Sequence, residues 1–341
     1  MIGVPLSSSI LVSAAVGLLP VLSFLAALVY FDSYKLVKLR TVVAVVASGI
    51  VVGGASYLVN GYAIDTLQMD MVNFTRYISP VTEEVLKGLV ILFLVRANRI
   101  GFLVDAAIFG FAVGTGFAVI ENLFYLRFVA DAGVGTWIVR GFGTALMHGG
   151  STAIFAVLGV GLQERFQRSL LAFLPGFAIA ILLHSAFNHL FLSPKLSTLA
   201  IIIVLPPLFL TVFQRSEKAI GDWLGKGFDA DTEMLDLIHS GHFSDSHIGQ
   251  YLHMLKATLK GPVVADVLCY LQLFTELSLR AKGILMMREN GFDVPIDEAT
   301  REKFSEMRYL ETSIGKTGLR AIQPMLHMSQ KDLWQLYMLG K

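Results

Sequence analysis

The chain has 341 residues, of which 55% are hydrophobic and 16% are charged, and its formal net charge at pH 7 is +1. About a quarter of the residues of a soluble domain are charged, so this chain has more apolar surface than one water-soluble core can bury, which excludes an ordinary soluble enzyme. The near-neutral charge gives no sign of a nucleic-acid partner, and the single Cys269 cannot form a disulfide within the chain.

Apolar runs predict about seven membrane-spanning helices in the first part of the chain. Each run has roughly the 17 to 25 residues that cross a hydrocarbon core of about 30 Å. Up to Phe213 the sequence holds 12 of its 27 Lys and Arg residues and 9 of its 26 Asp and Glu residues, and the remaining 128 residues hold the other 15 and 17. We therefore expect an all-α polytopic transmembrane bundle over 1–213 and a soluble helical domain over 214–341. The expected spans are 8–31, 41–59, 78–96, 102–126, 136–161, 169–192 and 196–213.

The cationic residues between these runs predict the orientation of the helices. Most Lys and Arg residues fall at one set of helix ends, such as Lys35, Arg99 and Arg215, and few fall at the other. Cations collect on the cytoplasmic side of a membrane. We therefore expect a multi-pass protein of the cell (inner or cytoplasmic) membrane, embedded in the lipid bilayer, with its N-terminus outside and its C-terminal domain in the cytoplasm.

The C-terminal region is also expected to be helical. Apolar residues from Val263 to Ala281 recur at spacings of three and four, as on one face of a helix. Gly291 and Pro295 are typical of the end of such a helix. Residues 329–332 (SQKD) resemble a capping box that opens a last short helix.

Polar side chains lie inside four of the expected membrane spans. A charge at the centre of a membrane helix costs at least about 2.5 to 3.5 kcal/mol, so such residues indicate a functional site. With a rise of about 1.5 Å per residue, all of them fall in the non-cytoplasmic half of the membrane, an agreement that unrelated helices would not share by chance. The residues are Glu83, Glu84 and Lys87 in the third span, Glu121 and Asn122 in the fourth, His148 in the fifth, and His184 and Asn188 in the sixth.

The spacing of these residues is compatible with hydrolytic chemistry. Glu83 and Lys87 are four residues apart, as are His184 and Asn188, so each pair shares a helix face. Lys87 can neutralise one of the neighbouring carboxylates while the other takes a proton from water. Two imidazoles and further carboxylates can hold a divalent metal with an open water position. The same groups can instead position a water and an oxyanion without a metal.

At these residues the sequence resembles the PrsW family of intramembrane proteases, which are relatives of the CAAX prenyl endopeptidases and bacteriocin-immunity proteins. The resemblance covers about residues 78–192. The last motif departs from the HxxxD of the best-known members, and the amide that replaces the Asp cannot act as a base. The matching motifs are EExxK from Glu83 to Lys87, FxxxE from Phe117 to Glu121, the isolated His148, and HxxxN from His184 to Asn188.

The resemblance implies a hydrolase that cleaves a peptide bond in a membrane-associated protein, as in regulated proteolysis of an anti-sigma-factor-like substrate. The family has been described both as metalloproteases and as metal-independent glutamate proteases, and the sequence leaves both mechanisms open. The catalytic residues that the resemblance implies are Glu83, Glu84, Glu121, His148, His184 and Asn188. The metal ligands expected for Zn²⁺ or another divalent metal are Glu84, Glu121, His148 and His184.

Two other classes of membrane protein compete with the protease. A transporter or channel could use the buried carboxylates as a proton or cation path, but it would need polar groups through the whole membrane, and the cytoplasmic half has little besides Asp105. A retinal-binding receptor would need a Lys in the last span, which has none, and a haem-binding carrier would leave the carboxylates unexplained.

Overall fold

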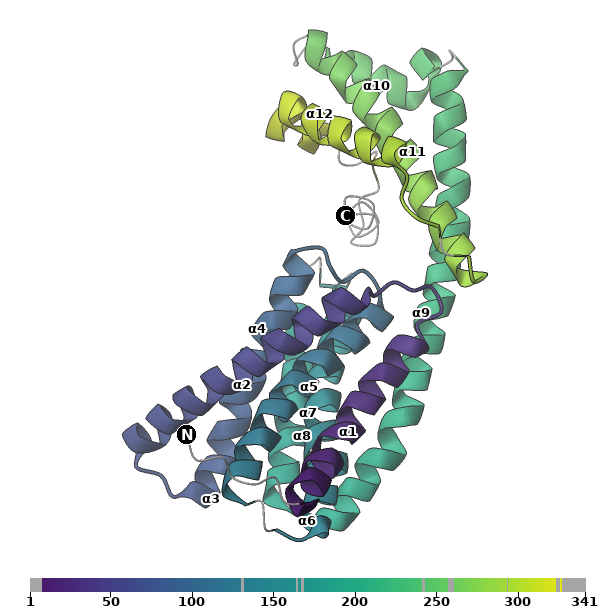
Figure 1. The fold of residues 1–341 in the computed structure, drawn as a ribbon. Helices are drawn as coiled ribbons and strands as arrows, with labels where there is room; N and C mark the ends of the chain where they lie inside the picture. The colour runs from purple at the N-terminus through teal and green to yellow at the C-terminus, as the bar shows by residue number, and fades with distance from the viewer. Residues whose placement is uncertain are drawn as a thin grey trace. The chain divides into compact units, whose positions relative to one another are not determined.

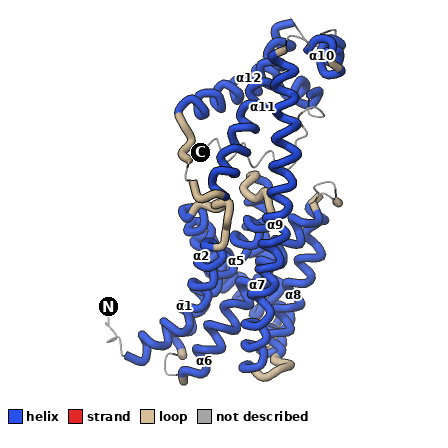
Figure 2. Tube along the Cα trace, turned by 90° about the vertical axis from the view of Figure 1, so that its right-hand side faces the viewer, coloured by secondary structure: helices blue, strands red, loops and turns tan. Residues whose placement is uncertain are grey.

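The chain is all helical in the residues that its structure describes. This computed structural model describes residues 8–129, 132–163, 165–166, 169–240, 243–256, 261–292, 294–322 and 326. All regular secondary structure in these ranges is helix (Figure 2), which confirms the expected all-α class. The chain forms two compact units, which we call the membrane unit (Met1–Asp32 with Leu36–Ser216) and the C-terminal unit (Ser33–Lys35 with Glu217–Lys341).

The helices of the membrane unit follow one another with short connections (Figure 1). Two of the elements are π-helical, and each leads directly into a helix that carries site residues. The elements are α1 (Ser8–Tyr30), α2 (Leu39–Leu67), α3 (Met71–Asn73), η1 (Phe74–Ile78), α4 (Ser79–Arg96), α5 (Leu103–Phe128), α6 (Val134–Ile138), η2 (Val139–Thr144), α7 (Ala145–Leu162), η3 (Leu170–Phe173), α8 (Leu174–His189) and α9 (Pro194–His239).

Among the residues that the structure describes, seven helices are long and apolar enough to cross a membrane, so the chain is a multi-pass membrane protein. The number matches the expectation, but the set does not. It leaves out α4, which carries Glu83, Glu84 and Lys87, and it includes the segment Pro262–Glu289, which we expected in the soluble region. The charged residues of α4 make its composition too polar for a typical membrane span. Even so, α4 packs among the other helices of the membrane unit.

Two of the expected helix ends are wrong. The second helix does not stop at residue 59 but continues to Leu67, and the last expected span does not stop at residue 213 but continues as α9 to His239. Backbone hydrogen bonds sustain a helix whether its side chains are apolar or polar, so a fall in hydropathy does not end it. Because α9 crosses the expected domain boundary after Phe213, that division of the chain stays a prediction.

The centre of the membrane unit is α5, which packs against α1, α2 and α7. Small residues let these helices approach closely, as is typical inside membranes. A Cβ atom added to Gly114 would lie 2.2 Å from the His148 carbonyl oxygen of α7, and one added to Gly116 would lie 2.0 Å from the Val46 carbonyl oxygen of α2. These glycines therefore set the distance at which α7 and α2 cross the central helix.

The outer helices of the membrane unit expose large apolar side chains. Examples are Leu19 on α1, Leu58 on α2, Phe93 on α4, Leu182 on α8 and Leu210 on α9, which are exposed by half or more. Large exposed apolar surfaces are rare on soluble monomers. These faces are suited to contact with lipid.

In its described residues, the C-terminal unit contains the end of α9 and four further elements, with α11 packed on α12. Lys282 is buried there and donates to Asp231 at 2.6 Å and to the Gly227 carbonyl at 2.8 Å. The helix expected from Val263 lies within α11, which ends just before Gly291, a residue with φ of +83°. The expected capping box at 329–332 lies outside the described residues. The four elements are η4 (Phe243–Asp245), α10 (His247–Leu255), α11 (Gly261–Glu289) and α12 (Glu298–Ile322).

Candidate active site

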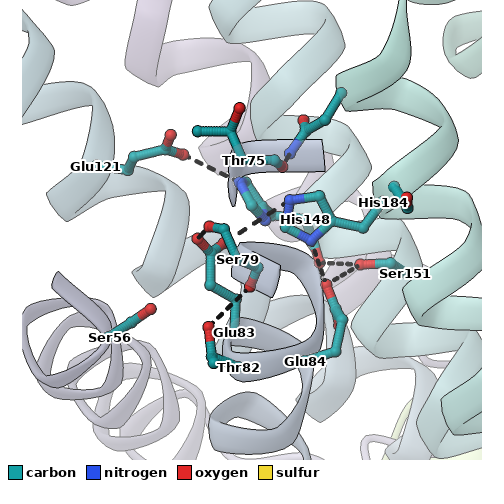
Figure 3. A network of polar contacts seen from close by, with 12 residues as sticks. Ser56, Thr75, Ser79, Thr82, Glu83, Glu84, Glu121, His148, Ser151 and His184 are labelled. Carbon is teal, nitrogen blue, oxygen red and sulfur yellow. Dashed lines mark hydrogen bonds and ion pairs between the residues drawn. The ribbon is translucent and has the colours of Figure 1, made fainter. Parts of the chain in front are cut away.

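Four helices of the membrane unit bring their ionisable side chains together in one cluster (Figure 3). Glu83 and Glu84 come from α4, Glu121 from α5, His148 from α7 and His184 from α8. The rings of the two histidines are perpendicular, with centroids 4.8 Å apart. The agreement in level that we inferred from the sequence therefore corresponds to direct contact among these five residues.

Glu84 is a fully buried hydrogen-bond acceptor in the cluster. Its Oε1 accepts from Lys87 Nζ at 2.5 Å, from His184 Nδ1 at 2.9 Å and from Ser151 Oγ at 3.2 Å. The Glu84 side chain is 1% exposed and that of Lys87 is 0% exposed. Removing either partner would leave the other as an unpaired charge in a dry interior, so the two residues are coupled.

His184 lies between the two adjacent carboxylates. Because a carboxylate only accepts, the contact with Glu84 fixes the proton of a neutral His184 ring on Nδ1. The other nitrogen, Nε2, then carries a lone pair and lies 3.7 Å from Glu83 Oε2. A carboxylate that orients a histidine in this way is typical of metal sites, where it fixes the tautomer of the ligand.

His148 lies between a cation and a carboxylate. Its Nδ1 is 3.2 Å from Lys87 Nζ, and its Nε2 is 2.9 Å from Glu121 Oε2. An ammonium group has only donors, so Nδ1 accepts and the proton of the neutral ring lies on Nε2, from which it is donated to Glu121. Lys87 thus holds Glu84 and His148 at the same time.

Glu83 is held by a group of small polar side chains that the sequence analysis did not identify. Its Oε1 accepts from Asn60 Nδ2 at 3.1 Å and from the Ser79 hydroxyl, and Thr82 donates to the Asn60 side-chain oxygen. The expected second span ended one residue before Asn60, which placed this residue in a loop. If the second span had been extended to Leu67, Asn60 would have been recognised as a polar residue inside a membrane helix. The sequence therefore contained the signal.

Arg140 is a second contributor that the sequence analysis did not identify as a site residue. It lies 3.3 Å from Glu121 Oε1, donates from Nε to Asn122 Oδ1 at 2.8 Å, and stacks on Tyr125 at 3.5 Å. Asn122 in turn donates to the Gly17 carbonyl of α1 at 2.8 Å. The network therefore ties Glu121 to η2 and to the first helix.

Asn188, which the HxxxN motif implied as a site residue, has a different partner. Its Nδ2 donates to the Thr75 carbonyl of η1 at 2.9 Å, while Ser185 donates to the Arg76 carbonyl at 2.6 Å. Within the described ranges, the hydrogen bonds of Asn188 do not reach the five clustered residues. Its expected catalytic role stays a prediction.

Three of the clustered residues lie close enough to share a metal ion, provided that His148 gives up the Nε2 proton that it donates to Glu121. One donor atom from each of Glu83, His148 and His184 lies within 4.8 Å of the other two. One carboxylate and two imidazoles form a donor set typical of catalytic zinc sites that keep a position open for water. The predicted ligand set named Glu84 and Glu121 in place of Glu83. In the structure, Glu84 accepts a hydrogen bond from His184 and Glu121 accepts one from His148.

A cavity of about 870 Å³ borders the cluster. Glu83 and Glu121 line it, together with residues of α2, η1 and α5. The side chains of Glu121 and Glu83 are 28% and 13% exposed. Those of the two histidines are at most 3% exposed. The two carboxylates are therefore the part of the cluster that a molecule in the cavity would meet.

Comparison with known proteins agrees with this geometry. The family model described as PrsW family intramembrane metalloprotease matches residues 38–212, which is just over half of the chain and contains the whole cluster. The comparisons with curated proteins and with solved structures gave no match. A transporter or channel is not favoured by this result. The chain therefore belongs to the PrsW family of intramembrane metalloproteases, and it is a multi-pass hydrolase that acts on membrane-protein substrates in the lipid bilayer.

Proposed function

We propose that this protein is an intramembrane endopeptidase in which Glu83 activates the water that attacks the scissile peptide bond. The observation that carries the proposal is that Glu83 both lines the cavity and lies beside the Nε2 atom of His184. Its Oε2 atom has capacity for a further hydrogen bond, because a carboxylate oxygen can accept two. A water held there would be close to the cavity and to an imidazole.

The two adjacent carboxylates have different roles in this mechanism. Glu84 is fully buried and already accepts from three donors, so it orients His184 and balances the charge of Lys87. Glu83 takes a proton from the water as the oxygen bonds to the carbonyl carbon. It then returns this proton to the amide nitrogen as the C–N bond breaks, which leaves a carboxyl product and an amine product.

His148 and Glu121 complete the wall of the site. Lys87 holds Nδ1 of His148, and Arg140 holds Glu121, so both side chains have fixed orientations. Of the two, Glu121 lines the cavity. Preorganised groups of this kind stabilise developing charge without reorganising during the reaction. We retain Asn188 as an oxyanion donor only as a prediction, because its amide holds the carbonyl of Thr75.

In the metal-dependent alternative, Glu83, His148 and His184 are the residues that would hold a divalent metal such as Zn²⁺. Glu83 would then be a ligand instead of the general base of the metal-independent mechanism. When bound, such an ion polarises water and the scissile carbonyl. The family description as a metalloprotease supports a bound metal. The carboxylate of Glu84 on Nδ1 of His184 supports it as well, because it leaves Nε2 free of a proton.

The substrate and the topology complete the proposal. By family analogy the substrate is an anti-sigma-factor-like membrane protein, and the excess of cations at one set of helix ends supports an outside N-terminus and a cytoplasmic C-terminal unit in the cell membrane. Cleavage would then occur in the non-cytoplasmic half of the bilayer.

The proposal is tested with the purified full-length protein in proteoliposomes, using fluorogenic transmembrane peptides that carry a helix-weakening Gly-Gly pair. Glu83→Gln is expected to lower kcat by at least about 100-fold, because general base catalysis contributes about 10² to 10⁴. Asp65→Asn is the control, since this exposed carboxylate of α2 lies outside the cluster. Wild-type turnover in the Glu83 variant would overturn its role.

Metal content is measured on the same preparations. The wild-type protein is expected to bind one divalent ion, and His184→Ala and Glu83→Gln are expected to lose it, whereas Asp65→Asn keeps it. Equal metal content in all four proteins would overturn the ligand assignment. Full cleavage by a metal-free wild-type protein would instead favour a metal-independent glutamate mechanism.

A further inference from the structure

The helix that carries Glu83 and Glu84 begins at a proline that cannot complete the hydrogen bonds of the turn before it. Pro80 is the second residue of α4 and has no backbone N–H group. It therefore cannot donate to the carbonyl of Arg76, four residues earlier as in an α-helix, or to that of Thr75, five residues earlier as in a π-helix. Both patterns meet here, because the π-helical η1 ends directly before α4. In a membrane helix, carbonyls freed by a proline need donors from neighbouring helices.

The neighbouring helix α8 supplies two such donors. Ser185 Oγ donates to the Arg76 carbonyl at 2.6 Å, and Asn188 Nδ2 donates to the Thr75 carbonyl at 2.9 Å. These are the two acceptors that Pro80 cannot serve. Because Ser185 and Asn188 are three residues apart, they share one face of α8. We call these two side chains the α8 clasp.

The clasp joins two helices whose relative position matters for the chemistry. On α8, His184 directly precedes Ser185, and its ring nitrogens lie 2.9 Å from Glu84 and 3.7 Å from Glu83. On the other side of the clasp, Thr75 lines the cavity and belongs to the polar network of Figure 3. Because α4 continues η1 without a break, a shift of η1 along α8 would displace both carboxylates relative to the histidine.

We propose that Ser185 and Asn188 are positioning residues that anchor the start of α4 to α8 and thereby fix Glu83 beside His184. This inference rests on the proposed role of Glu83 and adds the device that orients it. Asn188 acts here through its amide hydrogen, because the carbonyl of Thr75 requires a donor and an ionised Asp has none. The proline at the start of α4 therefore accounts for the amide at the end of the HxxxN motif.

The clasp is tested first without cleavage, by hydrogen exchange of the backbone N–H groups at 81–86 in the full-length protein. Ser185→Ala is expected to speed their exchange about 3- to 10-fold, which corresponds to the loss of one hydrogen bond. Ser185→Thr keeps a hydroxyl and is expected to exchange like the wild type. Ser48→Ala is the matched control, because the Ser48 hydroxyl also donates at 2.6 Å to a helix carbonyl, that of Val45 in its own helix. Unchanged exchange in Ser185→Ala would overturn the proposal.

The link to Pro80 is tested with a second change that returns the missing donor. Pro80→Ala restores an N–H group that can bond to the Arg76 carbonyl. In this background Ser185→Ala is expected to change the exchange at 81–86 by less than about twofold, because the two donors to one carbonyl substitute for each other. An equal effect of Ser185→Ala in both backgrounds would overturn the role assigned to the proline.

Kinetics with the fluorogenic peptide distinguish positioning from packing. Ser185→Ala is expected to lower kcat about 10- to 100-fold and to change KM less than about threefold, because it displaces a reacting group and leaves substrate binding intact. Ser185→Thr, and Pro80→Ala combined with Ser185→Ala, are expected to recover most of kcat. Wild-type kcat in Ser185→Ala would overturn the positioning role.

Asn188→Asp separates the clasp from a direct role of this residue in the reaction. It is expected both to lower kcat and to speed exchange at 81–86. Retained kcat with wild-type exchange would overturn the donor role, and lost kcat with wild-type exchange would assign Asn188 to the reaction itself and remove it from the clasp. If the wild-type protein cleaves no peptide but Ser185→Ala still speeds exchange, the anchoring of α4 is kept and the proposed function is overturned.

Discussion

The buried pair of Lys87 and Glu84 allows a quantitative test of how the site is held together. Their contact is 2.5 Å long and both side chains are excluded from solvent. Lys87→Met leaves the Glu84 carboxylate without its counter-ion, and Glu84→Gln leaves the Lys87 ammonium without its own. Each single change is expected to lower the free energy of unfolding by about 3 to 5 kcal/mol, because breaking a buried pair from one side leaves an uncompensated charge.

The double variant is expected to lose less free energy of unfolding than the two single variants lose together. With both charges removed, no ion remains unpaired in the interior, and the Gln side chain at position 84 can still bond to Ser151 and His184. We expect a coupling energy of about 2 to 3 kcal/mol, at the upper end of the range for residues in direct contact. The loss in the double variant should therefore be about 3 to 8 kcal/mol, compared with about 6 to 10 kcal/mol for the sum of the two single losses.

The assay is reversible unfolding of the full-length protein in mixed micelles of increasing SDS fraction. The buried Trp137 reports on the membrane unit after the other two Trp residues are replaced by Phe. The control cycle combines Lys87→Met with Asp65→Asn, which has no contact with it and should be additive within about 0.5 kcal/mol. Additive losses in the Lys87 and Glu84 cycle would refute the reasoning that the two charges compensate each other.

Two further predictions concern the supports of the site. Arg140→Gln is expected to lower kcat/KM for the fluorogenic peptide by about 10- to 100-fold, which is the usual effect of removing a partner that orients a site residue. An unchanged kcat/KM would show that Glu121 does not need Arg140 to hold its orientation. Gly114→Ala is expected to lower the free energy of SDS unfolding by about 1 to 3 kcal/mol, because its Cβ would overlap the His148 carbonyl oxygen. Gly54→Ala, in open space, should change the same free energy by less than about 1 kcal/mol, and an equal loss in both variants would contradict the close-packing argument.

Membership of the cluster was predicted well where the polar residue lies within an unambiguous apolar run. Glu121, His148 and His184 are isolated in such runs, and a charge or imidazole at that depth is costly unless other polar groups meet it. Asn60 and Arg140 lie where an apolar run appeared to end or begin, so the same rule did not identify them. Asn188 shows the opposite error, because sharing a helix face with His184 does not give it the same partner.

The sequence by itself determined that this protein spans the membrane and which residues would be expensive to leave unpaired there, because hydropathy and the cost of a buried charge are properties of each segment alone. Only the tertiary structure decided that Glu83 lines the cavity while Glu84 is enclosed by Lys87, Ser151 and His184. Neighbouring residues on a helix point about 100° apart. The packing of α2, α5, α7 and α8 around α4 therefore determines that Glu83 faces the cavity and that Glu84 faces the Lys87 ammonium.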